Sequence, residues 1–361
     1  MKNILLYLIL AAFSIARAIA QPASVKDFSF ITGSCAFLNR ALEDQQGIKY
    51  NGDTSIFYTM AGTNADFMLW LGDNWYLDEI ETRTIQGLKS KAASQRSSPL
   101  LRRIAEKMPE YAIWDDHDYG PNDAGYSFPL KKASREIFMD TWKANPGFGM
   151  NNEGVFTAFH QQDVLFVLLD SRWWRSSDKL WDYVPGKGRG GLMLPNPAKE
   201  MLGKSQMTWL KEMLLKDTSA FKIIVNGSQM LNPLAKGDCL VHFPSEYYEL
   251  LAFLHDNKIE GVIFLTGDRH FSEIIGLKRQ NDYPLYDITV SSLTADIDNP
   301  DGRERNNPYR VQGSLIRQHN FARITCSGPA NNRQLRVSMR NSKGIEFYYW
   351  DVYANQLKAP R

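Results

Sequence analysis

Short, nearly continuous apolar segments recur along the chain, separated by longer segments that mix apolar and polar residues. Apolar runs of this length are typical of strands covered on both faces of a sheet. We therefore predict strands over 28–35, 65–73, 110–116, 164–170, 221–229 and 261–268. The segment 155–160 precedes the fourth of these and is joined to it by Gln161-Gln162-Asp163, which predicts a hairpin.

The segments between the strands carry helical patterns. We predict helices over 55–63, 82–107, 130–145, 204–216 and 246–257, the second broken near Ser97-Ser98-Pro99. Four further strands follow in the last third of the chain, over 286–293, 321–326, 334–340 and 345–353. This alternation predicts an α/β fold in which a second sheet packs on the first, a four-layer α/β/β/α sandwich. The alternative is that the last strands form a small separate module.

The first twenty residues have the pattern of a secretory signal peptide. Lys2 precedes a long apolar run, and small residues precede a cleavage position after Ala20. The apolar core is short for a membrane anchor, and Arg17 interrupts it. We therefore expect a secreted or periplasmic protein whose single domain spans residues 21–361.

Composition narrows the function classes. A content of 43% hydrophobic and 12% aromatic residues suits a large core and excludes a disordered chain. The formal charge of +2 falls to zero once Lys2 and Arg17 leave with the signal, so there is no general attraction for nucleic acid or anionic membranes. Protein partners are not predicted.

Three cysteines are too few for a disulfide framework. Cys35, Cys239 and Cys326 allow at most one bridge and leave one thiol over. Cys239 and Cys326 could pair, but the sequence does not show whether they are close. The remaining thiol, Cys35, ends a predicted strand, which suggests a metal ligand rather than a buried apolar residue.

Polar residues gather where the predicted strands end. Five such ends carry Cys35, Asp73, Asp115-Asp116-His117, the segment 226–229 and Asp268-Arg269-His270. Ligands of α/β sheets bind beyond the carboxyl ends of strands, so these side chains should share one site. Clustered carboxylates repel each other unless a cation neutralises them. Thiolate and imidazole suit transition metals, whereas carboxylates suit hard ions, so the mixture predicts two unlike metals.

The motifs GSC at 33–35, GDNWY at 72–76, WDDHD at 114–118 and GDRH at 267–270 resemble, in order and spacing, those of the alkaline phosphatase D (PhoD-like) family of metallophosphoesterases. The resemblance covers roughly residues 28 to 330. It implies an Fe³⁺ site with two Ca²⁺ ions nearby.

The resemblance also assigns ligands. It implies that Cys35 and Tyr76 bind ferric iron, that Asp73 bridges metals, and that Asp268 and His270 supply the late metal-binding strand end. Two further ligands are expected where relatives differ in residue type: Asp116, where they commonly have Asn, and Gln229, where many have His.

Three residues are catalytic candidates. His117 lies among Asp115, Asp116 and Asp118, which predicts a raised pKa and a role as phosphate contact or general acid. Asp115 is expected to orient His117. Arg269 is expected either to bind phosphate oxygens or to form an ion pair with a nearby carboxylate. The aromatic and basic segment 171–191 is either a pocket wall or a packed surface loop.

These residues predict a metal-dependent hydrolase acting on phosphoester substrates, in which a metal-bound hydroxide or oxo group attacks phosphorus. One alternative is the same chemistry confined to diesters, such as nucleic acids, teichoic-acid-like polymers or phospholipid headgroups. The other is a non-catalytic secreted binding protein on the same fold. It is disfavoured because every ligand motif is intact.

Overall fold

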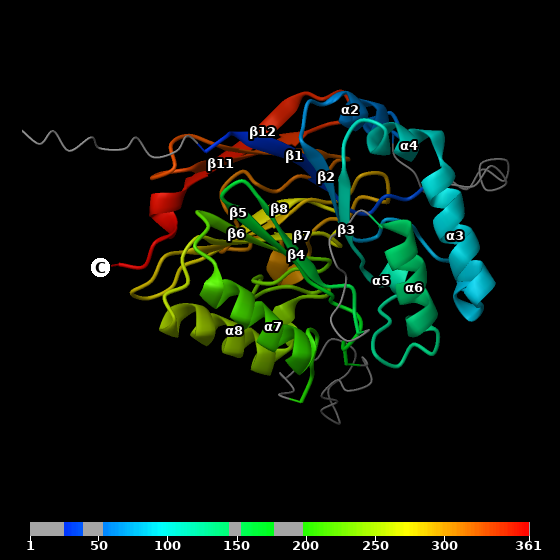
Figure 1. Cartoon of the computed structure of the whole chain (residues 1–361), viewed down its shortest axis with the longest axis horizontal. Helices are drawn as coiled ribbons and strands as arrows, with labels where there is room; N and C mark the ends of the chain where they lie inside the picture. Colours follow the sequence, from blue (N-terminus) through cyan, green and yellow to red (C-terminus); the bar gives the residue numbers. More distant parts are fainter. Residues whose placement is uncertain (1–24, 39–52, 144–152, 177–197, 361) are drawn as a thin grey trace, which may run out of the picture.

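Two six-stranded sheets stacked face to face organise the molecule (Figure 1). The computed structural model describes residues 25–38, 53–143, 153–176 and 198–360. The first sheet has the strand order β12-β11-β10-β1-β2-β3 and the second β4-β5-β6-β7-β9-β8. The predicted signal peptide and most of the segment 171–191 lie outside the described residues.

The first sheet combines strands from both ends of the chain. Its members are β1 (Phe28–Gly33), β2 (Phe67–Leu71), β3 (Glu110–Ile113), β10 (Phe321–Ser327), β11 (Gln334–Arg340) and β12 (Glu346–Tyr353). β1, β2 and β3 are parallel, whereas β10 pairs antiparallel with β1 and continues into β11 and β12. The last strands are therefore hydrogen-bonded into the main sheet and do not form a module of their own.

The second sheet has a parallel centre and antiparallel edges. Its members are β4 (Thr157–Gln161), β5 (Val164–Leu168), β6 (Phe221–Asn226), β7 (Val262–Thr266), β8 (Glu273–Leu277) and β9 (Leu285–Thr289). β4 and β5 form the predicted hairpin. The edge strand β8 was not predicted, because it is short, contains Gly276 and begins at a buried Glu273.

Helices cover the outer faces of both sheets. They are α2 (Ile56–Gly62), α3 (Ile85–Ser97), α4 (Pro99–Ala105), the short α5 (Asp116–Tyr119), α6 (Lys131–Thr141), α7 (Gly203–Lys216) and α8 (Pro244–Asp256). Short 3₁₀ turns occur at Glu81–Arg83, Leu240–His242, Gly302–Glu304 and Ala354–Leu357. The break between α3 and α4 is confirmed: Pro99 starts α4, and Ser98 Oγ accepts the N–H of Leu100.

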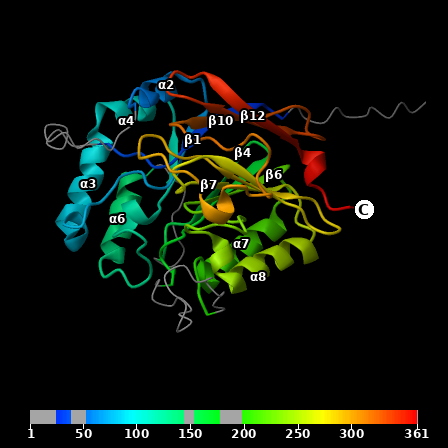
Figure 2. The same ribbon diagram turned by 180° about the vertical axis from the view of Figure 1, so that it is seen from behind.

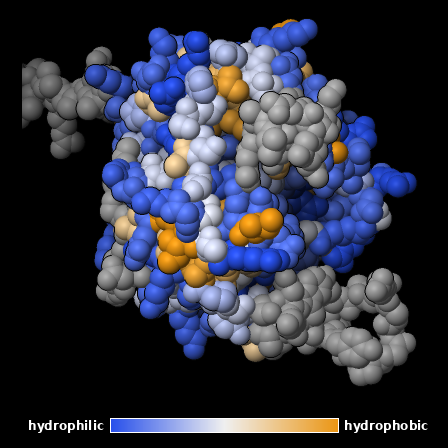
Figure 3. All heavy atoms as spheres, turned by 90° about the vertical axis from the view of Figure 1, so that its right-hand side faces the viewer, coloured by the Kyte–Doolittle hydropathy of each residue, from blue (hydrophilic) through white to orange (hydrophobic). Residues whose placement is uncertain are grey.

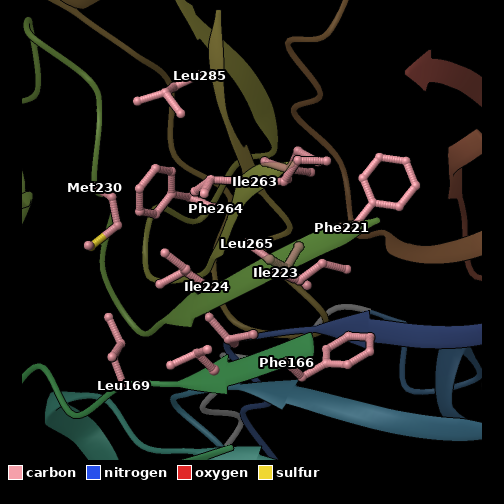
Figure 4. Packing of buried hydrophobic residues seen from close by; sticks show 14 of the residues in the cluster. Phe166, Leu169, Phe221, Ile223, Ile224, Met230, Ile263, Phe264, Leu265 and Leu285 are labelled. Atoms are coloured by element: carbon pink, nitrogen blue, oxygen red, sulfur yellow. The ribbon is translucent and has the colours of Figure 1, made fainter. Parts of the chain in front are cut away.

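Alternating side chains of the strands build two cores. Phe30 and Phe67 stack between the sheets and meet Phe166 of β5 edge-on, with ring centroids 5.2 and 5.5 Å away. On the other face of the first sheet, Ile31 and Trp70 pack against α2, α3, α4 and α6. Figure 4 shows part of the first core, where Phe166, Ile224 and Phe264 of the second sheet pack with their neighbours.

The reverse view shows the pair α7 and α8 on one side of the sandwich and α3 with α6 on the other (Figure 2). The predicted four-layer α/β/β/α order is therefore confirmed. The side of the molecule toward α3 and α6 is mainly hydrophilic, with small separate hydrophobic patches (Figure 3). Among the described residues, no helix has both the length and the apolar character needed to cross a bilayer.

Candidate metal centre

The residues that follow β1 and β2 meet at one edge of the first sheet. The strands are parallel and neighbours, so Cys35 and Asp73 come out side by side. Backbone hydrogen bonds continue the pairing beyond the strands, from Cys35 N to Gly72 O (3.4 Å) and from Ala36 N to Asp73 O (2.9 Å). The second sheet delivers Asp268 and His270 from the end of β7.

Four of these residues have unusual backbone conformations. The φ angles of Cys35, Asp73, Asp268 and His270 are 58°, 52°, 72° and 55°. Left-handed backbone at a non-glycine residue is costly and persists where the surroundings impose it, most often at functional sites.

A first group of ligand atoms combines Cys35, Asp73 and His270, which lie within 4.8 Å of one another. Cys35 Sγ is 3.6 Å from Asp73 Oδ2. Tyr76 joins the group, since its hydroxyl donates to Asp73 Oδ2 at 3.1 Å and lies 3.3 Å from His270 Nε2. Thiol, phenol, imidazole and carboxylate therefore converge on one point.

A second group combines Asp73, Asp116 and His117, again within 4.8 Å. Asp116 and His117 lie in the short helix α5, directly after β3. The N–H of His117 donates to Asp116 Oδ1 (2.9 Å) and lies 3.4 Å from Asp73 Oδ1. Asp73 is common to both groups, so a single carboxylate could bridge two ions.

Asp268 lies near these groups but belongs to neither. Its negative charge contributes to raising the pKa of Cys35. The structure therefore brings Asp268 to the edge of the cluster without placing a carboxylate oxygen among the other ligand atoms.

Burial makes the cluster electrostatically unfavourable without a cation. Burial is the largest cause that raises the pKa of Cys35, to about 11, and it raises the pKa of Tyr76 well above the ordinary value. The pKa of Asp73 is also raised, first by burial and then by repulsion from Cys35 and Asp116. A multivalent cation would reverse these penalties, because it attracts the charged form of every one of these groups.

His117 differs from the sequence-based prediction in its pKa. Burial is the largest influence and lowers the pKa of its imidazole, and the attraction of Asp116 does not overcome this effect. The expectation of a raised pKa considered the neighbouring carboxylates alone and was wrong. The ring lies beside that of Tyr76, with centroids 4.2 Å apart.

Asp115 makes no hydrogen bond to His117 in the part of the chain that the structure describes. Its carboxylate instead forms an ion pair with Arg172 (2.5 Å from Nε) and accepts a hydrogen bond from Ser171 Oγ (3.1 Å). Two glycines allow close approach to Asp115. A Cβ on Gly227 would lie 2.6 Å from its Cγ, and one on Gly72 2.8 Å from its Cβ.

Arg269 forms the ion pair that was considered as its alternative role. Its Nη2 contacts both carboxylate oxygens of Glu304, at 3.0 and 2.8 Å, and both side chains are buried. Among the described residues, its Nη1 has no hydrogen-bond partner. A Cβ added to Gly237 would lie 2.5 Å from this nitrogen and 3.7 Å from Asp268 Oδ2.

Gln229 is directed into a different network. Its Nε2 donates to Glu273 Oε1 (2.8 Å) and Thr289 Oγ1 (3.0 Å), and its Oε1 accepts from Asn232 (3.1 Å). The sequence position after β6 suggested a ligand, but the side-chain amide instead binds residues of β8 and β9. We therefore remove Gln229 from the proposed ligands.

Sequence reasoning missed Ser291, Arg172 and Asp238. Ser291 Oγ donates to Cys35 Sγ (3.1 Å) and accepts the N–H of His270 (2.9 Å), so it links two ligands. A serine after a strand carries no chemical signal of its own, whereas the two arginines of SRWWR could have been matched with the surplus of carboxylates.

All three cysteines are buried and free, so Cys239 and Cys326 do not form a disulfide.

Comparisons with known proteins agree with this geometry. The model of the PhoD-like phosphatase family matches residues 34–332. The chain is 22% identical to alkaline phosphatase D of Bacillus subtilis (strain 168) over 294 residues, 70% of this chain and 47% of that protein. It thus spans about half the length of this curated relative.

Solved structures share the fold at low sequence identity. A structure of PhoD has a TM-score of 0.68 and 17% identity, covering 95% of this chain and 73% of the other. The purple acid phosphatase PPD1 from yellow lupin seeds has a TM-score of 0.63 and 13% identity, covering 91% and 54%. GAP50, the anchor in the inner membrane complex of Plasmodium, has a TM-score of 0.53 and 15% identity, covering 93% and 90%. Since the family model spans most of the chain and includes Cys35, Asp73, Asp116 and His270, the chain belongs to the PhoD-like phosphatase family.

Proposed function

We propose that the chain is a metal-dependent phosphoester hydrolase. The observation that carries the proposal is the shared position of Asp73, whose carboxylate belongs to both groups of potential ligands. A carboxylate shared by two ions would hold them close together, as two-metal hydrolysis requires. Membership of a phosphatase family and the strained backbone at Cys35 and Asp73 support the same conclusion.

The donor sets favour different ions. Cys35 and His270 supply a thiolate and an imidazole, which suit transition metals, and Tyr76 adds a phenolate oxygen; we assign Fe³⁺ to this group together with Asp73. Asp116 adds a second carboxylate on the other side of Asp73, and we assign Ca²⁺ there. Asp268 stays a proposed ligand, on the ground of its place at the end of β7.

When bound, the two ions would neutralise the phosphate and activate a water molecule for attack on phosphorus. Side chains of the protein position the ligands and contact the substrate. Asp73 fixes the separation of the two positions, and Ser291 holds the Cys35 thiol and the His270 backbone together. His117 is proposed as a phosphate contact, because its imidazole is partly exposed, whereas Asp73 and Asp116 beside it are buried. Arg269 is committed to Glu304, and only its Nη1 remains for such a role.

Turnover of two chromogenic substrates tests the proposal. The purified protein should hydrolyse p-nitrophenyl phosphate or bis(p-nitrophenyl) phosphate, and the ratio of the two kcat/KM values distinguishes a monoesterase from a diesterase. Elemental analysis of the same sample should find iron and calcium. A protein that holds neither metal and hydrolyses neither substrate would favour the alternative of a binding protein on this fold. Export is proposed from residues 1–20 and is tested by sequencing the mature N-terminus.

A further inference from the structure

Two buried arginines follow the strand β5 without being part of the proposed ligand set. Arg172 is fully buried and Arg175 is 2% exposed, although arginine seldom loses all contact with water. They belong to the motif SRWWR, which the proposed chemistry leaves unused. A buried guanidinium needs negative partners, so the groups that contact these two arginines show what holds them in place.

A carboxylate from a distant loop lies between the two arginines. Asp238 Oδ2 is 2.9 Å from Arg172 Nη1, and Asp238 Oδ1 is 2.7 Å from Arg175 Nη2. Arg172 in turn contacts Asp115, at 2.5 Å. The result is a buried chain of four alternating charges that runs from the end of β3 to Arg175.

The chain closes into a ring through the loop after α5. Arg175 Nη1 donates to the carbonyl of Asp123 (2.9 Å), and the N–H of Asp123 donates to Asp116 Oδ2 (2.8 Å). Asp123 has a left-handed backbone with φ of 58°. The same loop is held by the N–H of Tyr126, which donates to the Arg175 carbonyl (2.9 Å). Asp115 and Asp116 are adjacent in the sequence. One end of the charge chain contacts Asp115 through Arg172, and the other end reaches Asp116 through Asp123.

The ring acts on one proposed ligand. Asp116 Oδ2 is held by the Asp123 N–H and Oδ1 by the His117 N–H, which fixes the plane of the carboxylate beside Asp73. We infer that Arg172, Asp238 and Arg175 are positioning residues that keep Asp116 oriented for the second metal. The inference rests on the proposed function, since it concerns that same site. Residues that hold ligands in place commonly change metal affinity by about 10- to 100-fold when replaced.

Two variants of the full chain test the inference, with a third as control. Asp238→Asn removes the charge between the arginines, and Arg175→Lys keeps a cation but cannot reach Asp123 and Asp238 together. Arg333→Lys is the control, because Arg333 is also fully buried and paired with Asp27 and Asp163, at the opposite end of β1. Each protein is stripped of divalent ions, titrated with Ca²⁺ by calorimetry, and examined for melting temperature and visible absorption.

The expected result is that both test variants bind Ca²⁺ about tenfold or more weakly, with the iron absorption unchanged. The control should melt lower and bind Ca²⁺ like the wild type. Folded test variants with wild-type Ca²⁺ affinity would overturn the inference. So would test variants that fail to fold while the control folds, because the ring would then serve the fold. A wild type that binds no Ca²⁺ would refute the proposed two-metal function, and the inference would fall with it.

Discussion

The hydroxyl of Tyr76 lies 3.3 Å from Nε2 of His270, although 194 positions separate the two residues. Tyr76 follows β2 of the first sheet, and His270 follows β7 of the second. The contact therefore joins the two sheets at the edge where the ligand groups meet. It explains why the group of Cys35, Asp73 and His270 needs the face-to-face packing of both sheets and cannot form from either alone.

Removal of the Cys35 thiol should abolish or strongly shift the visible absorption of the protein. A ferric ion bound by thiolate and phenolate should give a charge-transfer band, and Cys35→Ala removes the thiolate. Absorption spectra and iron analysis of the purified variant measure the effect. Cys326→Ala is the matched control, because Cys326 is also a buried free thiol but lies in β10. A colourless wild type that is active without iron would refute the iron assignment.

Chelation should separate the two metals. Hard ions held mainly by Asp73 and Asp116 exchange more readily than iron held by Cys35 and Tyr76. EGTA or EDTA should therefore remove activity while the visible band persists, and added Ca²⁺ should restore turnover. The measurement is the rate of p-nitrophenyl ester hydrolysis before and after dialysis. Activity that survives prolonged chelation would argue against a calcium-assisted site.

Gln229→Leu should weaken the fold and spare the metals. The variant leaves Glu273 and Thr289 short of a donor in the buried network, which costs about 1–3 kcal/mol of unfolding free energy. Metal content should not change, because the amide faces away from both ligand groups. Thermal melting measures the loss of stability, and elemental analysis measures the metal content. Loss of a metal ion without loss of stability would restore Gln229 to the ligand set.

Gly227→Ala should disturb the site through Asp115. The added Cβ would lie 2.6 Å from Asp115 Cγ, so either the carboxylate or the loop after β6 must shift. We expect a loss of stability of about 1–3 kcal/mol, as for other overpacked positions, and reduced turnover. Gly62→Ala is the control, since a Cβ there meets nothing within 4 Å at the end of α2. Equal melting temperatures for the two variants would contradict the steric argument.

Local patterns predicted most of the fold because apolar runs and breakers act over a few residues. The break at Ser98-Pro99 and the hairpin at Gln161–Asp163 are both local, and both are present. The ligands Cys35, Asp73 and His270 were predicted to meet because strand ends share an edge, and the structure brings them together. The strand β8 has no comparable signal, because Gly276 interrupts a short apolar stretch.

The direction of individual side chains could not be predicted from strand ends. Asp115 and Asp116 are neighbours in the sequence, yet Asp115 faces the buried Arg172 and Asp116 faces Asp73. The difference arises because Asp115 precedes α5 as its N-cap, whereas Asp116 is the first residue of that helix. The pKa of His117 was misjudged for a related reason: the neighbouring charges are visible in the sequence, but burial is not.

Asp73→Asn is the most demanding test, because Asp73 is the ligand that both groups share. The substitution keeps the volume of the side chain but removes the charge that would hold two cations. We expect activity to fall by at least about a thousandfold, on the order of 4 kcal/mol of transition-state stabilisation. Metal analysis should show loss at both positions, while the metal-free proteins melt alike because the apolar strand β2 is intact. Asp66→Asn, at the opposite end of the same strand, should change neither quantity. Near-normal turnover by Asp73→Asn would remove the bridging carboxylate and with it the two-metal site.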